Sequence, residues 1–346
     1  MAAASGVHPT PPGRRRAGTI PAGRPAPGPR AGTADAVLLG LTAVAGGGLA
    51  LQARLNGELG VRLGSPLAAG AVNFLTGLGV VTLAVAVRRV PLRRVLHPAT
   101  RRWWHWTGGL CAVVFVCSVV VATPRLGVSL VSVAVAGGMA TAGLLADAIG
   151  LGPAGRQPPG LARVAGAAIA VAAVMVSSSG AARGAGQAPY VVVAVAGGFA
   201  VGCQQPLNAR LSRAVGDTGL AAVASFAVGS VASVAVASTA GPVHPWPSDP
   251  ALYAGGALAA AYVLVATPAV GRLGALRVSL TTITGQMVAA ALLDVVAPIG
   301  DHRLTAWNLA GVLLAIGAIV LTARPQAGPG GRRRTRAPSS ARMRTG

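Results

Sequence analysis

The chain has 346 residues, of which 53% are hydrophobic and only 10% are charged, and its formal net charge is +22. Soluble domains usually contain about 25% charged residues, so this composition, with its long apolar runs, excludes an ordinary soluble protein and indicates an integral membrane protein. Every basic residue is arginine. Because the arginines lie in the tails and between apolar runs, without interleaved aromatic residues, the charge does not indicate nucleic-acid binding.

Both ends of the chain are rich in Arg, Pro and Gly. Residues 1–33 lack the apolar stretch of a signal peptide, and residues 324–346 have the same character. Neither segment carries enough apolar surface to fold, so both are predicted to be disordered cytoplasmic tails. Their arginines are expected to contact the anionic headgroups of the lipid bilayer.

Ten apolar segments are long enough to cross the roughly 30 Å of hydrocarbon in a bilayer. They are rich in Ala, Val, Gly and Leu and show no strand-like alternation, so helices are expected. The predicted fold class is therefore an all-α polytopic membrane protein with ten transmembrane helices. The predicted spans are residues 35–53, 67–87, 104–123, 128–149, 160–179, 189–209, 218–238, 251–268, 275–296 and 305–323.

The arginines also predict the orientation of these spans. With the N-terminus in the cytoplasm, 24 of the 29 arginines fall in cytoplasmic segments and five fall outside. This asymmetry follows the positive-inside rule for membrane proteins. Both termini are therefore predicted to be cytoplasmic, which agrees with an even number of spans.

The chain contains an internal repeat that divides it into a first half, residues 34–182, and a second half, residues 183–323. A shift of 152 residues gives nine identities in the 32 positions from 46 to 77. Each half has five spans, an odd number, so the halves are predicted to be inverted repeats, as in secondary transporters. The identities include Gln52 with Gln204, Asn56 with Asn208, Gly64 with Gly216, Phe74 with Phe226, and Gly77 with Gly229.

Three motifs together resemble a known family. They are Gln-x-x-Leu-Asn after a Gly-rich first helix, Phe-x-x-Gly in the next helix, and "GQM…LLD" in the fourth helix of the second half. Over residues 35–323 the chain is similar to the drug/metabolite transporter superfamily, nearest to the YdcZ-like inner-membrane exporters, here in a fused ten-helix form. The resemblance implies a multi-pass exporter in the cytoplasmic (inner) membrane of a bacterium.

The sequence departs from that superfamily in two places. The first half has Gly138 where the second half has Gln286, so the polar site is expected to be asymmetric. Small multidrug pumps of the superfamily use an acidic residue deep in the first helix, whereas the first span here offers only Asp35, at its start. The pump mechanism therefore cannot be transferred to this chain.

Seven polar residues are candidates for substrate binding. Amides and hydroxyls among apolar helices either contact a substrate or bond neighbouring helices, and the sequence leaves both alternatives open. The Gln and Asn of each motif lie four residues apart, on one helical face. Because the first predicted span ends at residue 53, the motif is expected at the membrane boundary. The candidates are Gln52, Asn56, Asn73, Gln204, Asn208, Ser225 and Gln286.

Asp147 and Asp294 end the fourth helix of each half and are candidates for ion coupling, since carboxylates in membrane segments often relay protons. The alternative is an interfacial Asp, and Arg156 is a candidate partner that would hold Asp147 ionised. Gln286 lies two turns from Asp294, so Asp294 is assigned the coupling role before Asp147. The Thr-Pro pairs at 123–124 and 267–268 are interpreted as the ends of the third helices, as loop entries or as hinges.

The leading functional hypothesis is a secondary transporter that exports a small metabolite or toxic compound by alternating access. The alternative is a non-transporting membrane scaffold or partner subunit, and the sequence leaves a homodimer open. An enzyme is not expected, because no catalytic triad, nucleotide loop or metal-ligand spacing is found. We therefore assign no catalytic residue, metal or cofactor.

Overall fold

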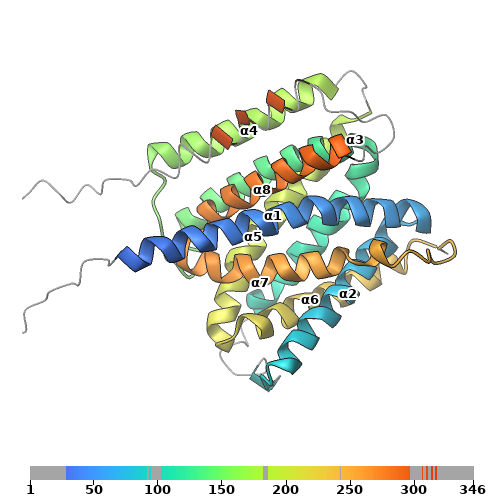
Figure 1. Ribbon diagram of the computed structural model, residues 1–346, viewed down its shortest axis with the longest axis horizontal. Coiled ribbons are helices and arrows are strands. Elements are labelled where there is room, and N and C mark those ends of the chain that lie inside the picture. The colour runs from blue at the N-terminus through green and yellow to red at the C-terminus, as the bar shows by residue number, and fades with distance from the viewer. Residues whose placement is uncertain are drawn as a thin grey trace, which may run out of the picture.

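The computed structural model describes residues 29–91, 93–94, 103–181, 186–241 and 243–296, with a few residues between 306 and 317. These residues form a bundle of helices (Figure 1). Its long helices are α1 (Pro29–Leu63), α2 (Pro66–Val87), α3 (Thr107–Ile149), α4 (Leu161–Ala181), α5 (Ala188–Val215), α6 (Thr218–Ala237), α7 (Gly255–Leu273) and α8 (Ala275–Val296). Two short 3-10 helices, η3 (Trp103–Trp106) and η4 (Pro250–Tyr253), precede α3 and α7.

Eight described segments are long and apolar enough to cross a membrane, and the two parts of α3 count separately among them. The fifth predicted span coincides with α4, whose described apolar part, Leu161–Ala172, is shorter than a full span. The tenth predicted span lies mostly outside the described residues, as do both predicted tails. Residues 29–33, predicted as tail, already belong to α1.

The first connection of each half uses the same local chemistry. Gly64 and Gly216 have positive φ angles of 66° and 77°, a conformation that glycine adopts without a steric cost. The residue after each glycine caps the next helix. Ser65 Oγ accepts the Ala68 N–H at 3.2 Å before α2, and the Asp217 carboxylate caps α6 in the same way. The same glycine turn and side-chain cap therefore separate the first two helices of each half.

The junction between the third and fourth helices of each half is also the same in both halves. Gly127 (φ 76°, ψ 163°) bends α3, and Gly274 (φ 90°, ψ 159°) separates α7 from α8. Both backbones lie in a region that side chains disfavour. Pro124 and Pro268, predicted to end their helices, instead lie inside helix. The helices end three or more residues later because only glycine permits the required backbone angles.

The two halves contact one another reciprocally. A Cβ atom added at Gly77 in α2 would overlap the ring of Phe226 in α6, and one added at Gly229 in α6 would overlap the ring of Phe74 in α2. Phe and Gly therefore exchange partners between the halves. In Figure 1, α2 and α6 lie together at one edge of the bundle, whereas α4 lies at the opposite edge, where it contacts α3.

A second reciprocal contact shows how the second part of α3 corresponds to α8. A Cβ atom at Gly138 in α3 would overlap the carbonyl oxygen of Val195 in α5, and one at Gly285 in α8 would overlap that of Ala43 in α1. Ala43 and Val195 are related by the same shift of 152 residues. Gly138 thus corresponds to Gly285, and its sequence alignment with Gln286 is wrong by one residue.

Candidate functional site

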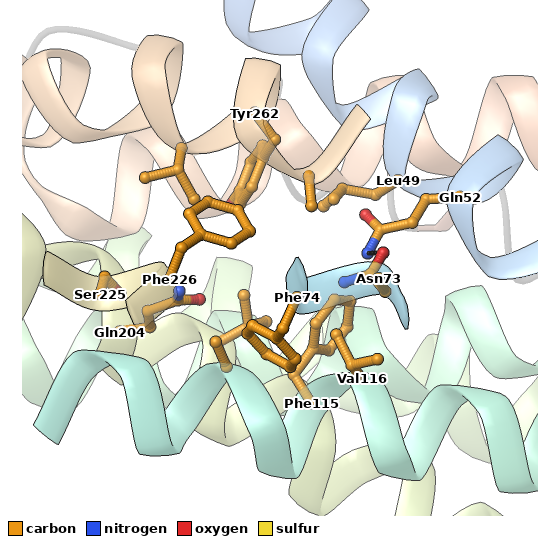
Figure 2. A pocket seen from close by; sticks show the side chains of 14 residues that line it. Leu49, Gln52, Asn73, Phe74, Phe115, Val116, Gln204, Ser225, Phe226 and Tyr262 are labelled. Carbon is orange, nitrogen blue, oxygen red and sulfur yellow. Dashed lines mark hydrogen bonds between the residues drawn. The ribbon is translucent and has the colours of Figure 1, made fainter. Parts of the chain in front are cut away.

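An internal cavity lies where the two halves meet, and six helices line it (Figure 2). Small residues on α1, α2 and α5 let the backbones of these helices lie close to their neighbours. The side chains that face the cavity are therefore brought near one another. The lining residues are Leu49 and Gln52 of α1, Asn73 and Phe74 of α2, Ala112, Phe115 and Val116 of α3, Val201 and Gln204 of α5, Ser225 and Phe226 of α6, and Ala259, Tyr262 and Val263 of α7.

The cavity is nearly closed in this state. The rings of Phe74 and Phe226 meet with centroids 6.0 Å apart and planes inclined by 59°. The centre of a water molecule has only about 20 Å³ in which to move, although the space between the lining atoms amounts to about 360 Å³ when its open part is included. The smaller volume is room for about one water molecule. A larger occupant requires the two rings, and the helices that carry them, to separate.

On one side of the cavity lies an amide cluster, which we define as Gln52, Asn56 and Asn73 and of which Gln52 and Asn73 line the cavity. Asn73 Oδ1 accepts two hydrogen bonds, from Gln52 Nε2 at 3.1 Å and from Asn56 Nδ2 at 2.9 Å. All three side chains are at most 3% exposed. Gln52 Oε1 and Asn73 Nδ2 have no hydrogen-bond partner among the described residues. The cluster therefore binds helix α1 to α2 and still leaves one acceptor and one donor unused.

The second half supplies Gln204 and Ser225 to the opposite side of the cavity, with Phe74 and Phe226 between the two sides (Figure 2). Both polar residues are buried. The structure thus brings four of the seven predicted substrate-binding residues into one cavity: Gln52, Asn73, Gln204 and Ser225.

The motif asparagines do not line the cavity. Asn56 Oδ1 lies against Gly255 at the start of α7, and Asn208 Oδ1 lies against Gly108 at the start of α3. The Asn208 amide has no hydrogen-bond partner among the described residues. Each asparagine therefore lies between a helix of one half and the start of a helix of the other half.

The position of the motif corrects the expectation that the first helix of each half ends there. Helix α1 continues to Leu63 and α5 to Val215, so Gln52 and Gln204 lie inside their helices and are buried there. The sequence suggested an early end because polar residues interrupt the apolar run. The tertiary structure accommodates them because neighbouring helices cover them.

Gln286 is buried in α8 but is not a lining residue of this cavity. Its Oε1 has no hydrogen-bond partner among the described residues. The aromatic lining residues Phe115 and Tyr262 were not among the predicted site residues, and Phe74 and Phe226 were recognised only as markers of the repeat. The chain has four Phe residues, and three of them line the cavity. This rarity is a signal that the sequence already contained.

Asp147 joins three helices at one end of the bundle. Its carboxylate accepts the N–H groups of Ala275 and Leu276 at 2.9 and 3.1 Å, which are the first two N–H groups of α8. It also forms an ion pair with Arg163 of α4 and is 2% exposed. A carboxylate at a helix N-terminus is stabilised by the unpaired N–H groups and by the helix dipole.

The partner of Asp147 differs from the prediction. Arg156 donates from Nε to the carbonyl oxygen of Ala148 at 2.9 Å, and Arg163 takes the place that was expected for Arg156. Arg163 begins the next helix and can reach back from it, a contact that sequence distance does not reveal. The side chain of Asp294 lies outside the described part of the structure.

The same end of the bundle, which we call the basic end, also holds Arg210 and Arg213 of α5 and Arg272 of α7. Arg210 donates to the carbonyl oxygen of Gly150, and its guanidinium lies 5.3 Å from the ring centroid of Trp104. Arg213 donates to the carbonyl oxygens of Pro153 and Gly271. These contacts connect α5 to the loop after α3 and to α7.

Two further ion pairs lie at the basic end, and the Arg272–Asp35 pair is exposed on both sides. Arg88 of α2 pairs with Asp217 at 2.8 Å, and Arg272 of α7 pairs with Asp35 of α1. Ion pairs between exposed side chains contribute little, about 0–1 kcal/mol each. The Asp147 cap is the one of these contacts whose carboxylate is fully buried.

The opposite end of the bundle has fewer described contacts of this kind between helices. Arg62 pairs with Glu58 one turn away in the same helix, at 2.8 Å. Arg125 of α3 lies 5.6 Å from the ring centroid of Tyr190 of α5. A second cavity, where the centre of a water molecule has about 330 Å³, lies beside these two residues. The described polar contacts between helices are thus concentrated at the basic end, and the second cavity lies at the opposite end.

Comparison with known families accounts for both halves. The family described as "Putative inner membrane exporter, YdcZ" matches residues 37–176 and, separately, residues 189–321. These stretches correspond to the two halves of the repeat and together cover most of the chain. No individual curated protein matches the chain. With eight described segments of membrane-crossing length, this is a multi-pass inner-membrane protein. The chain belongs to the YdcZ family of the drug/metabolite transporter superfamily.

Proposed function

We propose that this protein is a secondary transporter that exports a small molecule by alternating access, with the substrate bound in the cavity between Phe74 and Phe226. The observation that carries the proposal is the origin of the lining. Each half contributes a Gln, a Phe and a second polar residue from equivalent positions, so the cavity lies on the contact surface between the halves. Substrate sites of transporters with inverted repeats form at such surfaces.

The proposal includes ten transmembrane helices in two inverted halves, with the basic end and both termini in the cytoplasm. Equivalent junctions at Gly127 and Gly274, together with the reciprocal Phe–Gly contacts, support two copies of one unit. The concentration of arginine contacts at one end supports its cytoplasmic orientation. In this orientation the described state is closed toward the cytoplasm.

Alternating access then requires two changes. The halves separate at the opposite end to release the substrate, and the contacts of Arg210 and Arg213 break when the basic end opens to load it. These arginines bond to backbone carbonyls, which remain hydrated when exposed, so opening exchanges protein hydrogen bonds for bonds to water. Arg210 and Arg213 can therefore lose these contacts without becoming unsolvated charges.

A scaffold without transport is the alternative, and the amide cluster argues against it. A buried polar network that serves only packing is most stable when every group is paired. Here Gln52 Oε1 and Asn73 Nδ2 remain unpaired beside a cavity. Such a network is costly for a scaffold but useful to a protein that binds a polar ligand.

Uptake of labelled metabolites into inside-out proteoliposomes tests the proposal. The wild type should accumulate at least one compound above the level of protein-free vesicles. Phe74→Trp and Phe226→Trp, which fill the cavity, should abolish that uptake. Phe199→Trp is the matched control, because Phe199 is 39% exposed and does not line the cavity. Equal uptake by the cavity-filled variants and the wild type would contradict the proposed site.

A further inference from the structure

We infer that the cavity selects an electrically neutral molecule that presents one hydrogen-bond donor and one acceptor, as a carboxamide or lactam does, next to an apolar ring. This inference rests on the proposed transport function and specifies its substrate class. It comes from three observations on the described residues: the charge of the lining, the two unpaired amide atoms, and the aromatic rings around them.

The first observation is the absence of charge. None of the described residues that line the cavity is acidic or basic. The chain has seven acidic residues, and the five whose side chains are described lie near helix ends: Asp35, Glu58, Asp147, Asp217 and Asp249. A buried ion without an opposite charge is strongly disfavoured. A permanent cation or anion would therefore enter this cavity without a described counter-charge.

The second observation is the pair of unused groups on the amide cluster. Gln52 Nε2 donates to Asn73 Oδ1, so the two side-chain amides lie directly beside each other. Gln52 Oε1 is left as an acceptor and Asn73 Nδ2 as a donor, both without a partner in the described structure. A ligand that offers an N–H and a C=O a short distance apart can pair with both atoms. A ligand with only one of these groups leaves the other atom unpaired.

The third observation is the composition of the remaining surface. Phe74, Phe115, Phe226 and Tyr262 surround the space beside the amide cluster (Figure 2). Aromatic rings favour an apolar or aromatic body through stacked and edge-to-face contacts. The Tyr262 hydroxyl is buried and has no hydrogen-bond partner among the described residues, so it is available as a further polar contact.

Benzamide, benzamidinium and benzoate form a direct test, because they share a ring and a planar head group and differ mainly in charge. Acetophenone adds a neutral compound that has the acceptor without the donor. Binding of the four compounds to the purified protein in lipid nanodiscs is measured by saturation-transfer NMR, with empty nanodiscs as the blank. We expect benzamide to bind at least about tenfold more tightly than the other three, the difference expected from one unmade buried hydrogen bond.

Variants connect the result to the cavity. Gln52→Leu and Asn73→Leu should each weaken benzamide binding by about tenfold, to the level of acetophenone. Gln205→Leu is the matched control and should leave binding unchanged, because Gln205 is equally buried in α5 but is not a lining residue. Melting curves of the ligand-free variants show whether each one is folded.

The outcomes separate this inference from the proposed function. Tighter binding of benzamidinium or benzoate would overturn the neutral class while leaving the transporter and its cavity intact. Benzamide binding that survives both amide-cluster variants would overturn the role of Gln52 and Asn73. If none of the four compounds binds, the inference fails together with the proposed site, whereas uptake of another compound into proteoliposomes would still support transport.

Discussion

Phe74 and Phe226 occupy equivalent positions in the two halves, and their rings meet 6.0 Å apart at the cavity. Each ring also fills the space above a glycine of the other half, Gly229 for Phe74 and Gly77 for Phe226. One residue pair thus lines the cavity and joins the halves. Movement of the halves and access to the cavity are therefore coupled through the same two side chains.

Gly77→Ala should destabilise the protein, because its methyl group would overlap the Phe226 ring in a packed region. Overpacking of this kind costs about 1–3 kcal/mol in free energy of unfolding. Gly79→Ala, two residues later in α2, is the control, since no described atom lies within 4 Å of the added Cβ. Reversible unfolding in mixed micelles compares them. Equal stability of both variants would contradict the reciprocal packing.

Asn56→Ala should lower the stability of the ligand-free protein by about 0.6–1.7 kcal/mol, the range for a hydrogen bond between membrane helices, because it removes the bond to Asn73. Asn208→Ala should cost less, since the Asn208 amide makes no hydrogen bond in the described structure. The free energy of unfolding of each ligand-free variant, compared with that of the wild type, measures both losses. A larger loss for Asn208→Ala would show that its contact with Gly108 is the more important one.

Asp147→Asn should reduce folding and expression while leaving the transport of correctly folded molecules largely unchanged. The substitution removes the charge that pairs with Arg163 and weakens the cap on the first N–H groups of α8. Folded yield in the membrane fraction, followed by transport per folded molecule, separates the two effects. Normal yield with abolished transport would instead indicate that Asp147 is the coupling residue.

Asp294→Asn should abolish transport that depends on a pH gradient while preserving substrate binding. Of the two residues predicted to couple transport to protons, Asp147 is already bound by the N-terminus of α8 and by Arg163, which leaves Asp294 for that role. Uptake with and without a pH gradient measures the effect. If Asp294→Asn transports normally under a gradient, coupling uses another ion or the protein catalyses facilitated diffusion.

Cysteine labelling tests the inverted orientation of the halves. In a variant without Cys111, Cys117 and Cys203, a cysteine at Arg62 should react with a membrane-impermeant thiol reagent added outside the cell. One at Arg213, in the equivalent region of the second half, should react only after the membrane is permeabilised. A cysteine at Arg94 serves as an exposed cytoplasmic control. Labelling of Arg62 and Arg213 positions from the same side would exclude inverted halves.

The sequence alone determined the helical membrane fold, the internal repeat and the family. These features depend on local composition and on identities between aligned residues. Apolar runs of sufficient length form helices because the bilayer leaves backbone groups no other partner. The alignment also paired Gly64 with Gly216, and both adopt the left-handed backbone that favours glycine. The Gln-x-x-Leu-Asn motif likewise identified both Gln52 and Gln204, which line the cavity.

Only the tertiary structure decided how these elements meet. Phe226 and Gly77 are far apart in the sequence, and no local pattern indicates that they touch. Three further features depend on which helix faces pack together. They are the equivalence of Gly138 with Gly285, the pairing of Asp147 with Arg163, and the fact that Gln52 lines the cavity while Asn56 does not. Packing selects those faces because small residues let two backbones approach, and a single-residue shift turns a helix by about 100° and exchanges the side chains that meet.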